Sequence, residues 1–228
     1  MKSNVSENKI GTENLTSAER RHALVGPSDL WESKRAFQID FLHRFGLKSE
    51  HYLLDVGCGT LRGGLPLIAY LEKEHYFGFD VSEEVLAEGR KELEESGLNW
   101  KRPTIMHVPD VSQLRLPAKF DFIWAFSVLI HMSDRILNDT LRFVQLHLAD
   151  TGVFYANVRY GKKEDGKWKW AQAVWRSLEF YKAACARYGL SVVDMGALQD
   201  FGHVSHREDA DCQRMLKISP ASAIAIAD

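Results

Sequence analysis

Residues 53–64 have the sequence LLDVGCGTLRGG and form the most informative segment of this 228-residue chain. An apolar strand ends in Asp55, Gly57 and Gly59 then allow a tight turn with close backbone approach, and a helical segment begins at Gly64. Open parallel sheets bind their ligands at the carboxyl ends of their strands, beside turns of this kind. The segment therefore predicts an α/β fold with a ligand site at this turn.

From Gly46 onward, strand-like segments alternate with segments of helical length. Strands joined by crossover helices form a mainly parallel, doubly wound sheet with helices on both faces. No helix-length segment separates the last two strands, so the final pair should be antiparallel. The seven predicted strands are 51–56, 76–79, 104–108, 120–126, 152–158, 190–197 and 215–219, and the predicted helices between them are 64–73, 83–95, 134–149 and 178–188.

Residues 1–45 are expected to form an extension that precedes a single domain spanning 46–228. The first 14 or so residues are polar and lack periodicity, which predicts a disordered leader. An amphipathic helical extension follows and ends at Gly46. Its apolar face would pack against the domain. Alternatively, Trp31 and Arg35, which border that face, would let the extension act as a lid over a ligand.

The composition excludes several classes of protein. Hydrophobic residues make up 45% of the chain, which indicates a globular fold. With 29 basic and 31 acidic residues the formal net charge is −2, so nucleic acid is an unlikely partner. Three cysteines without CxxC spacing disfavour a disulfide framework or a structural metal and fit a reducing cytoplasm. No signal-peptide core and no window of 18 apolar residues is present, so we expect no membrane association.

Two carboxylates indicate which ligand suits the glycine turn. Asp80 ends the next predicted strand, YFGFD, where a carboxylate would meet the two hydroxyls of a ribose. Gly63 comes one position too late for the dinucleotide fingerprint GxGxxG. Asp55 would repel a pyrophosphate, whereas it suits the cationic amino and sulfonium groups of S-adenosylmethionine. The site is therefore predicted to bind S-adenosylmethionine.

From about Leu53 to Ser219 the chain resembles the class I, Rossmann-like S-adenosylmethionine-dependent methyltransferases. Their sheet also ends in an antiparallel strand pair. The resemblance implies a cofactor site made by the ends of the first four strands. Its residues here would be Asp55, Gly57, Cys58 and Gly59 for the methionine part, Asp80 for the ribose, Val81 for the adenine face, Asp110 with Val111 for the adenine amino group, and Phe126 with Ser127 beside cofactor and substrate.

Two features of particular branches of that family are missing from the sequence. No NPPY-type tetrapeptide follows the fourth strand, which disfavours methylation of nucleobase or protein amide nitrogens. No metal triad with a lysine, as in the catechol-methylating branch, is found, so no metal ion is predicted. The methyl acceptor therefore stays open.

Several polar residues are candidates for contact with that acceptor. His131 follows the fourth strand and could act as a general base, although Ser133 and Asp134 nearby equally suit a helix-entry role. His203, in the loop between the last two strands, is a second candidate base. The expected substrate or lid residues are Arg159 and Tyr160, at the end of the fifth strand, and Trp31 and Arg35 in the extension.

The sequence thus predicts a cytoplasmic enzyme that moves the methyl group of S-adenosylmethionine onto an O, N or S atom of a small-molecule acceptor. The alternative is a noncatalytic S-adenosylmethionine-binding module or partner subunit. An NAD(P)-dependent oxidoreductase is disfavoured, because the glycine spacing differs and no Tyr-xxx-Lys pair is present. The sequence leaves the oligomeric state open.

Overall fold

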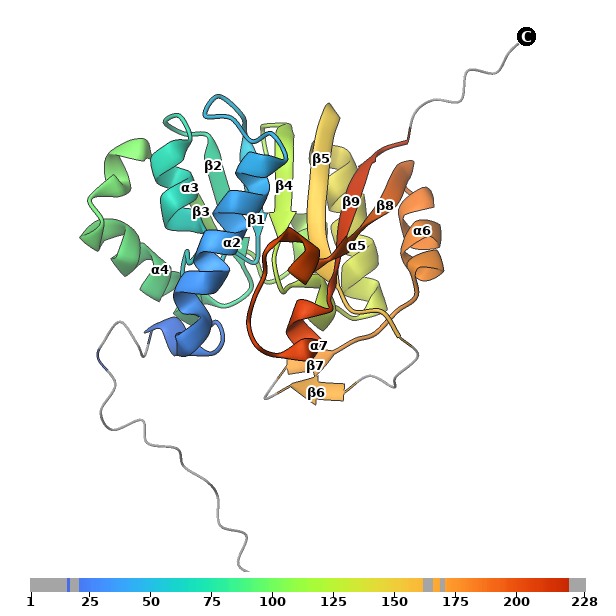
Figure 1. The fold of residues 1–228 in the computed structure, drawn as a ribbon. Helices are drawn as coiled ribbons and strands as arrows, with labels where there is room; N and C mark the ends of the chain where they lie inside the picture. The colour runs from blue at the N-terminus through green and yellow to red at the C-terminus, as the bar shows by residue number, and fades with distance from the viewer. Residues whose placement is uncertain (1–15, 17–20, 162–165, 169–170, 222–228) are drawn as a thin grey trace, which may run out of the picture.

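The computed structural model describes residues 16, 21–161, 166–168 and 171–221, and its centre is a seven-stranded sheet (Figure 1). Strand β9 runs antiparallel to both of its neighbours, and the other pairs are parallel. The predicted fold class is confirmed. In spatial order the strands are β3 (Thr104–His107), β2 (Tyr76–Asp80), β1 (Leu53–Val56), β4 (Phe120–Ala125), β5 (Leu148–Val158), β9 (Arg214–Pro220) and β8 (Leu190–Ala197).

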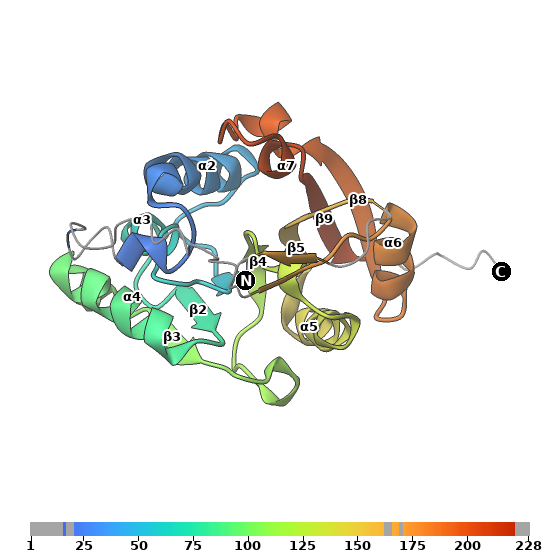
Figure 2. The same cartoon turned by 90° about the horizontal axis from the view of Figure 1, so that it is seen from below.

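Helices cover both faces of this sheet (Figure 2). Apolar side chains of α2, α3 and α4 belong to one buried cluster, and those of α5 and α6 belong to the other. No helix in the described part of the chain is long and apolar enough to cross a membrane. The helices are α2 (Trp31–Arg44), α3 (Gly64–Tyr70), α4 (Glu83–Glu95), α5 (Asp134–His147), α6 (Leu178–Ala186) and the short α7 (Glu208–Asp211).

Serine residues begin three of these helices. The hydroxyl oxygens of Ser82, Ser133 and Ser177 each accept a hydrogen bond from the backbone N–H three residues later. Such caps satisfy an N–H group that has no partner within the helix. Gly97 and Gly189 follow α4 and α6 in the left-handed conformation, which glycine adopts without a Cβ clash. Local sequence therefore sets the ends of the helices that flank the sheet.

The structure contains short elements that were not predicted. Strands β6 (Gly166–Trp168) and β7 (Ala171–Ala173) pair with each other in a separate two-stranded sheet. Single 3-10 turns occupy Ser28–Leu30, Leu98–Lys101, Val111–Gln113, Leu129–His131 and Leu198–Phe201.

Helix α2 is part of the core. Phe37, Phe41 and Leu42 are buried in the same cluster as β1 and α3. The Trp124 indole N–H of β4 donates to the Gln38 Oε1 of α2 at 3.1 Å. Helix α2, which was expected as part of the extension, thus packs as part of the domain, and the described residues 21–30 precede it. The predicted disordered leader lies outside the described residues.

Candidate active site

The glycine turn after β1 has the conformation that its sequence requires. Gly57 and Gly59 have φ angles of +71° and +59°, a region that other residues rarely adopt. A Cβ on Gly57 would lie 2.6 Å from Val128 Cγ2, and one on Gly59 would lie 2.9 Å from Val25 Cγ1. The Gly57 and Cys58 N–H groups donate to the Phe79 carbonyl at the end of β2. The turn is therefore fixed in shape and leaves no room for larger residues.

A cavity of about 290 Å³ lies against this turn. Most of the residues predicted to bind a cofactor line it. Asp110 and Val111 do not, because the Asp110 side chain instead accepts the Ser112 N–H at 2.9 Å on the surface. The predicted residues that line the cavity are Asp55, Gly57, Cys58, Gly59, Asp80, Val81, Phe126, Ser127 and His131.

Two carboxylates of this cavity lie in different surroundings. Asp55 is buried and accepts a hydrogen bond from the Tyr76 hydroxyl at 2.8 Å. Burial raises the pKa of Asp55 to about 7, and the Tyr76 hydrogen bond opposes that rise. Asp80 accepts backbone N–H groups from Gly59 and Ser82, both at 3.0 Å. A carboxylate accepts about four hydrogen bonds, so Asp80 retains capacity for two hydroxyl donors.

The cavity also includes residues that sequence reasoning missed. Gln38, Thr60 and Arg62 line it, and the buried Thr60 hydroxyl has no hydrogen-bond partner among the described residues. The Arg62 guanidinium lies 5.8 Å from the Trp31 ring centre and donates to the Val25 carbonyl at 3.3 Å. Burial lowers the pKa of Arg62 to about 10, and Asp55 opposes this. Arg62 lies within the quoted motif, but nothing in the local sequence distinguishes it from a residue that only separates Gly59 from Gly63.

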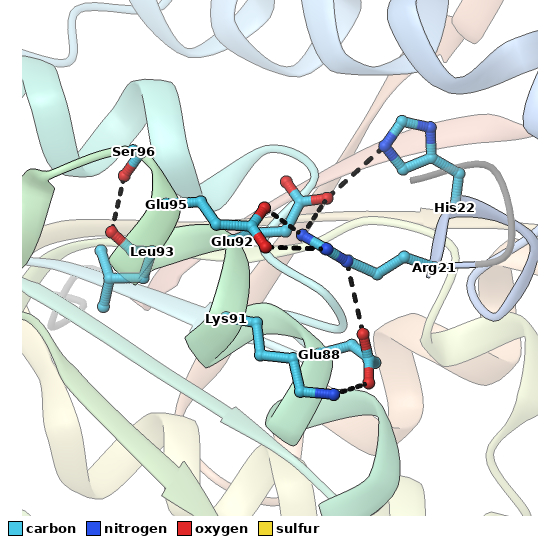
Figure 3. A network of polar contacts seen from close by, with 8 residues as sticks. All are labelled: Arg21, His22, Glu88, Lys91, Glu92, Leu93, Glu95 and Ser96. Carbon is cyan, nitrogen blue, oxygen red and sulfur yellow. Dashed lines mark hydrogen bonds and ion pairs between the residues drawn. The ribbon is translucent and has the colours of Figure 1, made fainter. Parts of the chain in front are cut away.

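Residues 21–26 close one side of the cavity. Leu24 and Val25 line it. Arg21 anchors this segment to α4, where its guanidinium lies 3.3 Å from Glu88, 3.4 Å from Glu92 and 2.8 Å from Glu95 (Figure 3). The nearby glutamates and the Glu95 hydrogen bond raise the pKa of Arg21 despite its burial.

Trp31 and Arg35 do not line this cavity. Trp31 is buried and stacks on the His22 ring at 3.6 Å, so it supports the covering segment from behind. Arg35 is half-buried on α2. Neither residue is thus part of the cavity lining.

A second cavity of about 240 Å³ adjoins the first, and His131 and Ser127 line both. Arg176 fixes the loop that carries His131, because its Nη2 donates to the Met132 carbonyl at 2.7 Å and to Asp134 at 2.6 Å. Arg159 also lines the second cavity. His131 therefore lies where the two cavities meet.

The two remaining predicted residues lie elsewhere. His203 is buried, with its Nδ1 2.7 Å from an Asp211 carboxylate oxygen and its ring edge-on to Phe37 at 5.0 Å. Burial lowers the pKa of His203. The side chain lines neither cavity. Tyr160 lines a third cavity with Arg159, and burial raises its pKa.

The first cavity fits S-adenosylmethionine. The cavity lies against a turn whose two glycines leave the backbone open to close approach, and the unpartnered Thr60 hydroxyl is available to a polar ligand. Buried Asp55 and Arg62 match the amino and carboxylate groups of the methionine part.

Within the described ranges, no group of three or more His, Cys, Asp or Glu side chains could hold a metal ion.

We expect the affinity for S-adenosylhomocysteine, the demethylated cofactor, to rise by about tenfold between about pH 5.5 and 7.5. The reason is that Asp55, with a pKa of about 7, becomes negatively charged over this interval and can then pair with the amino group. The ligand-free protein should lose stability as the pH rises from about 4 to 7, because burial raises the pKa of Asp55 in the folded state. Calorimetric titrations at several pH values measure the affinity. A pH profile that Asp55→Asn leaves unchanged would contradict this role.

The chain is similar to known methyltransferases. Residues 54–154 match the model of a family described as a methyltransferase domain. A S-adenosylmethionine-dependent methyltransferase from Clostridium acetobutylicum ATCC 824 is 14% identical, with a TM-score of 0.63 over 84% of this chain and 92% of the other. The magnesium protoporphyrin IX methyltransferase from Synechocystis PCC 6803, solved with S-adenosylmethionine bound, is 18% identical, with a TM-score of 0.65 over 91% of this chain and 93% of the other.

A third structure, the glycopeptide N-methyltransferase MtfA, is 15% identical, with a TM-score of 0.62 over 85% of this chain and 97% of the other. At such identities these likenesses show the shared fold. The family match covers the glycine turn and the first strands around it, and residues of this range line the cavity described above. Residues 54–154 therefore match a methyltransferase domain, and the chain has the Rossmann-like fold of class I methyltransferases, whose methyl donor is S-adenosylmethionine.

Proposed function

We propose that this enzyme methylates an O, N or S atom of a small molecule. The observation that carries the proposal is the second cavity, which adjoins the cofactor cavity at Ser127 and His131. Its lining also includes residues of α2, of α7 and of the loops beside α2, β5 and α7. Its volume of about 240 Å³ suits a small molecule or one group of a larger one. The names of two structural neighbours, a porphyrin and a glycopeptide methyltransferase, also refer to acceptors of this kind.

The residues of the first cavity suit separate parts of the donor. Asp80 would accept hydrogen bonds from the ribose hydroxyls, and Val81, which is 68% exposed, offers apolar surface to the adenine. Asp55 and Arg62 would pair with the amino and carboxylate groups. When bound there, S-adenosylmethionine supplies a methyl group on a sulfonium, which is a good leaving group.

The chain itself mainly has to position the acceptor. Alignment of an acceptor atom with the methyl group contributes roughly 7 to 11 kcal/mol to lowering such barriers. His131, where the cavities meet, would take the proton from an acceptor that is protonated at neutral pH, which adds about 10² to 10⁴ in rate. Residues 24 and 25 would help to exclude water from the donor.

Transfer of a radioactive methyl group tests the proposal. The protein is incubated with methyl-labelled S-adenosylmethionine and, separately, with a small-molecule extract, RNA and unfolded protein. We expect label in the small-molecule fraction, and its loss in His131→Ala if a base is needed. Label only in RNA or protein would contradict the small-molecule acceptor. Cofactor binding without transfer to any fraction would favour the noncatalytic binding module.

A further inference from the structure

The second cavity has a strongly positive lining in a chain whose net charge is −2. Three cations line it: Lys34 from α2, Arg159 just after β5, and Arg207 just before α7. No Asp or Glu is among the described residues that line it. These cations are far apart along the sequence and belong to three separate parts of the fold. Only the folded structure brings them together.

Two of these cations differ in how firmly their surroundings hold them. The Arg159 guanidinium lies 5.3 Å from the Trp175 ring centre, and its backbone carbonyl accepts the Arg176 N–H at 3.1 Å. Arg207 lies at the rim, with a Nη2 3.7 Å from Asp29 in a solvent-exposed pair. Exposed pairs of this kind contribute little, so Arg207 can turn to a ligand at small cost.

Two of these cations lie apart from Arg62, the residue expected to bind the carboxylate of the cofactor. Arg62 lines the first cavity only, whereas Arg159 and Arg207 line the second and are absent from the lining of the first. Lys34 lies close to Arg62 although it lines the second cavity. A Cβ on Gly26 would lie 4.0 Å from the Lys34 Nζ and 3.9 Å from the Arg62 Nη1. The positive lining thus continues away from the cofactor, into the space where an acceptor would lie.

We propose that the methyl acceptor carries an oxyanion, a carboxylate or a phosphate, bound by Arg159 and Arg207 with help from Lys34. This inference rests on the proposed small-molecule methyltransferase function. Arginine presents a planar set of donors that matches such oxyanions with two parallel hydrogen bonds. Leu30 and Ile130 in the same lining would contact an apolar body of the acceptor, whose nucleophilic atom then faces His131.

Three probes of similar shape test the proposal on the full-length protein saturated with S-adenosylhomocysteine. Phenyl phosphate and benzoate carry the two oxyanions, and benzyl alcohol is the neutral comparison. We expect one of the anions to bind at least tenfold more tightly than the alcohol, and the tighter of the two identifies the group. Arg159→Gln and Arg207→Gln should each weaken anion binding about tenfold and leave the affinity for S-adenosylhomocysteine unchanged, which also shows that the variants are folded.

Arg135→Gln is the matched control, because Arg135 is an exposed arginine on α5 paired with Asp139 and lines neither cavity. It should change no affinity. Equal binding of anions and alcohol, or anion binding that both arginine variants retain, would overturn the inference while the proposed function stands. Anion binding at this site with no methyl transfer to any fraction would instead contradict the proposed function and leave the anion site in place.

Discussion

Asp80→Ala should raise the Kd for S-adenosylhomocysteine by about a hundredfold or more. In the proposed complex Asp80 accepts two hydroxyl hydrogen bonds from the ribose, and bonds to a charged acceptor contribute about 1.5 to 3 kcal/mol each. A loss of about 3 kcal/mol corresponds to a factor above one hundred. The substitution also frees the Gly59 and Ser82 N–H groups that Asp80 now holds, which loosens the glycine turn. Calorimetric titration measures the change.

Asp121→Ala is the matched control for that variant. Asp121 is also a sheet carboxylate that accepts a backbone N–H, from Tyr52 at 2.8 Å, but it lies in β4 at the opposite end of the sheet. Its removal should leave the affinity for S-adenosylhomocysteine unchanged. A folded Asp80→Ala protein with the wild-type Kd would show that the ribose lies elsewhere.

Deletion of residues 1–26 should leave the domain folded, weaken S-adenosylhomocysteine binding by about tenfold or more, and abolish most of the turnover. The deletion removes Leu24 and Val25 from the cavity lining, together with the carbonyl that accepts the Arg62 hydrogen bond. It spares α2, whose Phe37 and Phe41 belong to the core. Thermal unfolding, calorimetry and the methyl-transfer assay separate the three effects.

Arg21→Met tests the same segment with one substitution. It should act in the same direction but more weakly, because it removes only the anchor to Glu88, Glu92 and Glu95. Lys91→Met is the control, since Lys91 is an exposed cation on α4 that contacts the same Glu88 (Figure 3). If the protein that lacks residues 1–26 unfolded, residues 21–26 would be needed for the stability of the fold. If it kept full affinity and activity, they would not be a lid.

Features that depend on neighbouring residues could be predicted from the sequence. The glycine turn and the lack of a segment long enough for a crossover helix between the last two strands predicted the sheet and its antiparallel end, because each is a local signal. Between those strands lies the α-helix α7, which is only four residues long. Asp55 and Asp80 were predicted in the same way, from their positions at the ends of two strands. Both line the cavity, as strand ends of a parallel sheet require.

Features that depend on distant contacts could not be predicted in this way. The ion pairs of Arg21 join residues more than 60 positions apart, and nothing local distinguishes this arginine from a surface one. His203 has the polar loop sequence of an accessible residue, yet it is buried beside Asp211. The positive second cavity likewise exists only where three separate elements meet.

A crystal structure with S-adenosylhomocysteine bound would test the central claim most directly, namely that the first cavity holds the methyl donor and the second receives the acceptor. We predict that the ribose hydroxyls contact Asp80 and that the sulfur faces the boundary at Ser127 and His131, open to the cavity of Lys34 and Arg159. A ligand with its ribose away from Asp80, or with its sulfur turned from that boundary, would contradict the account.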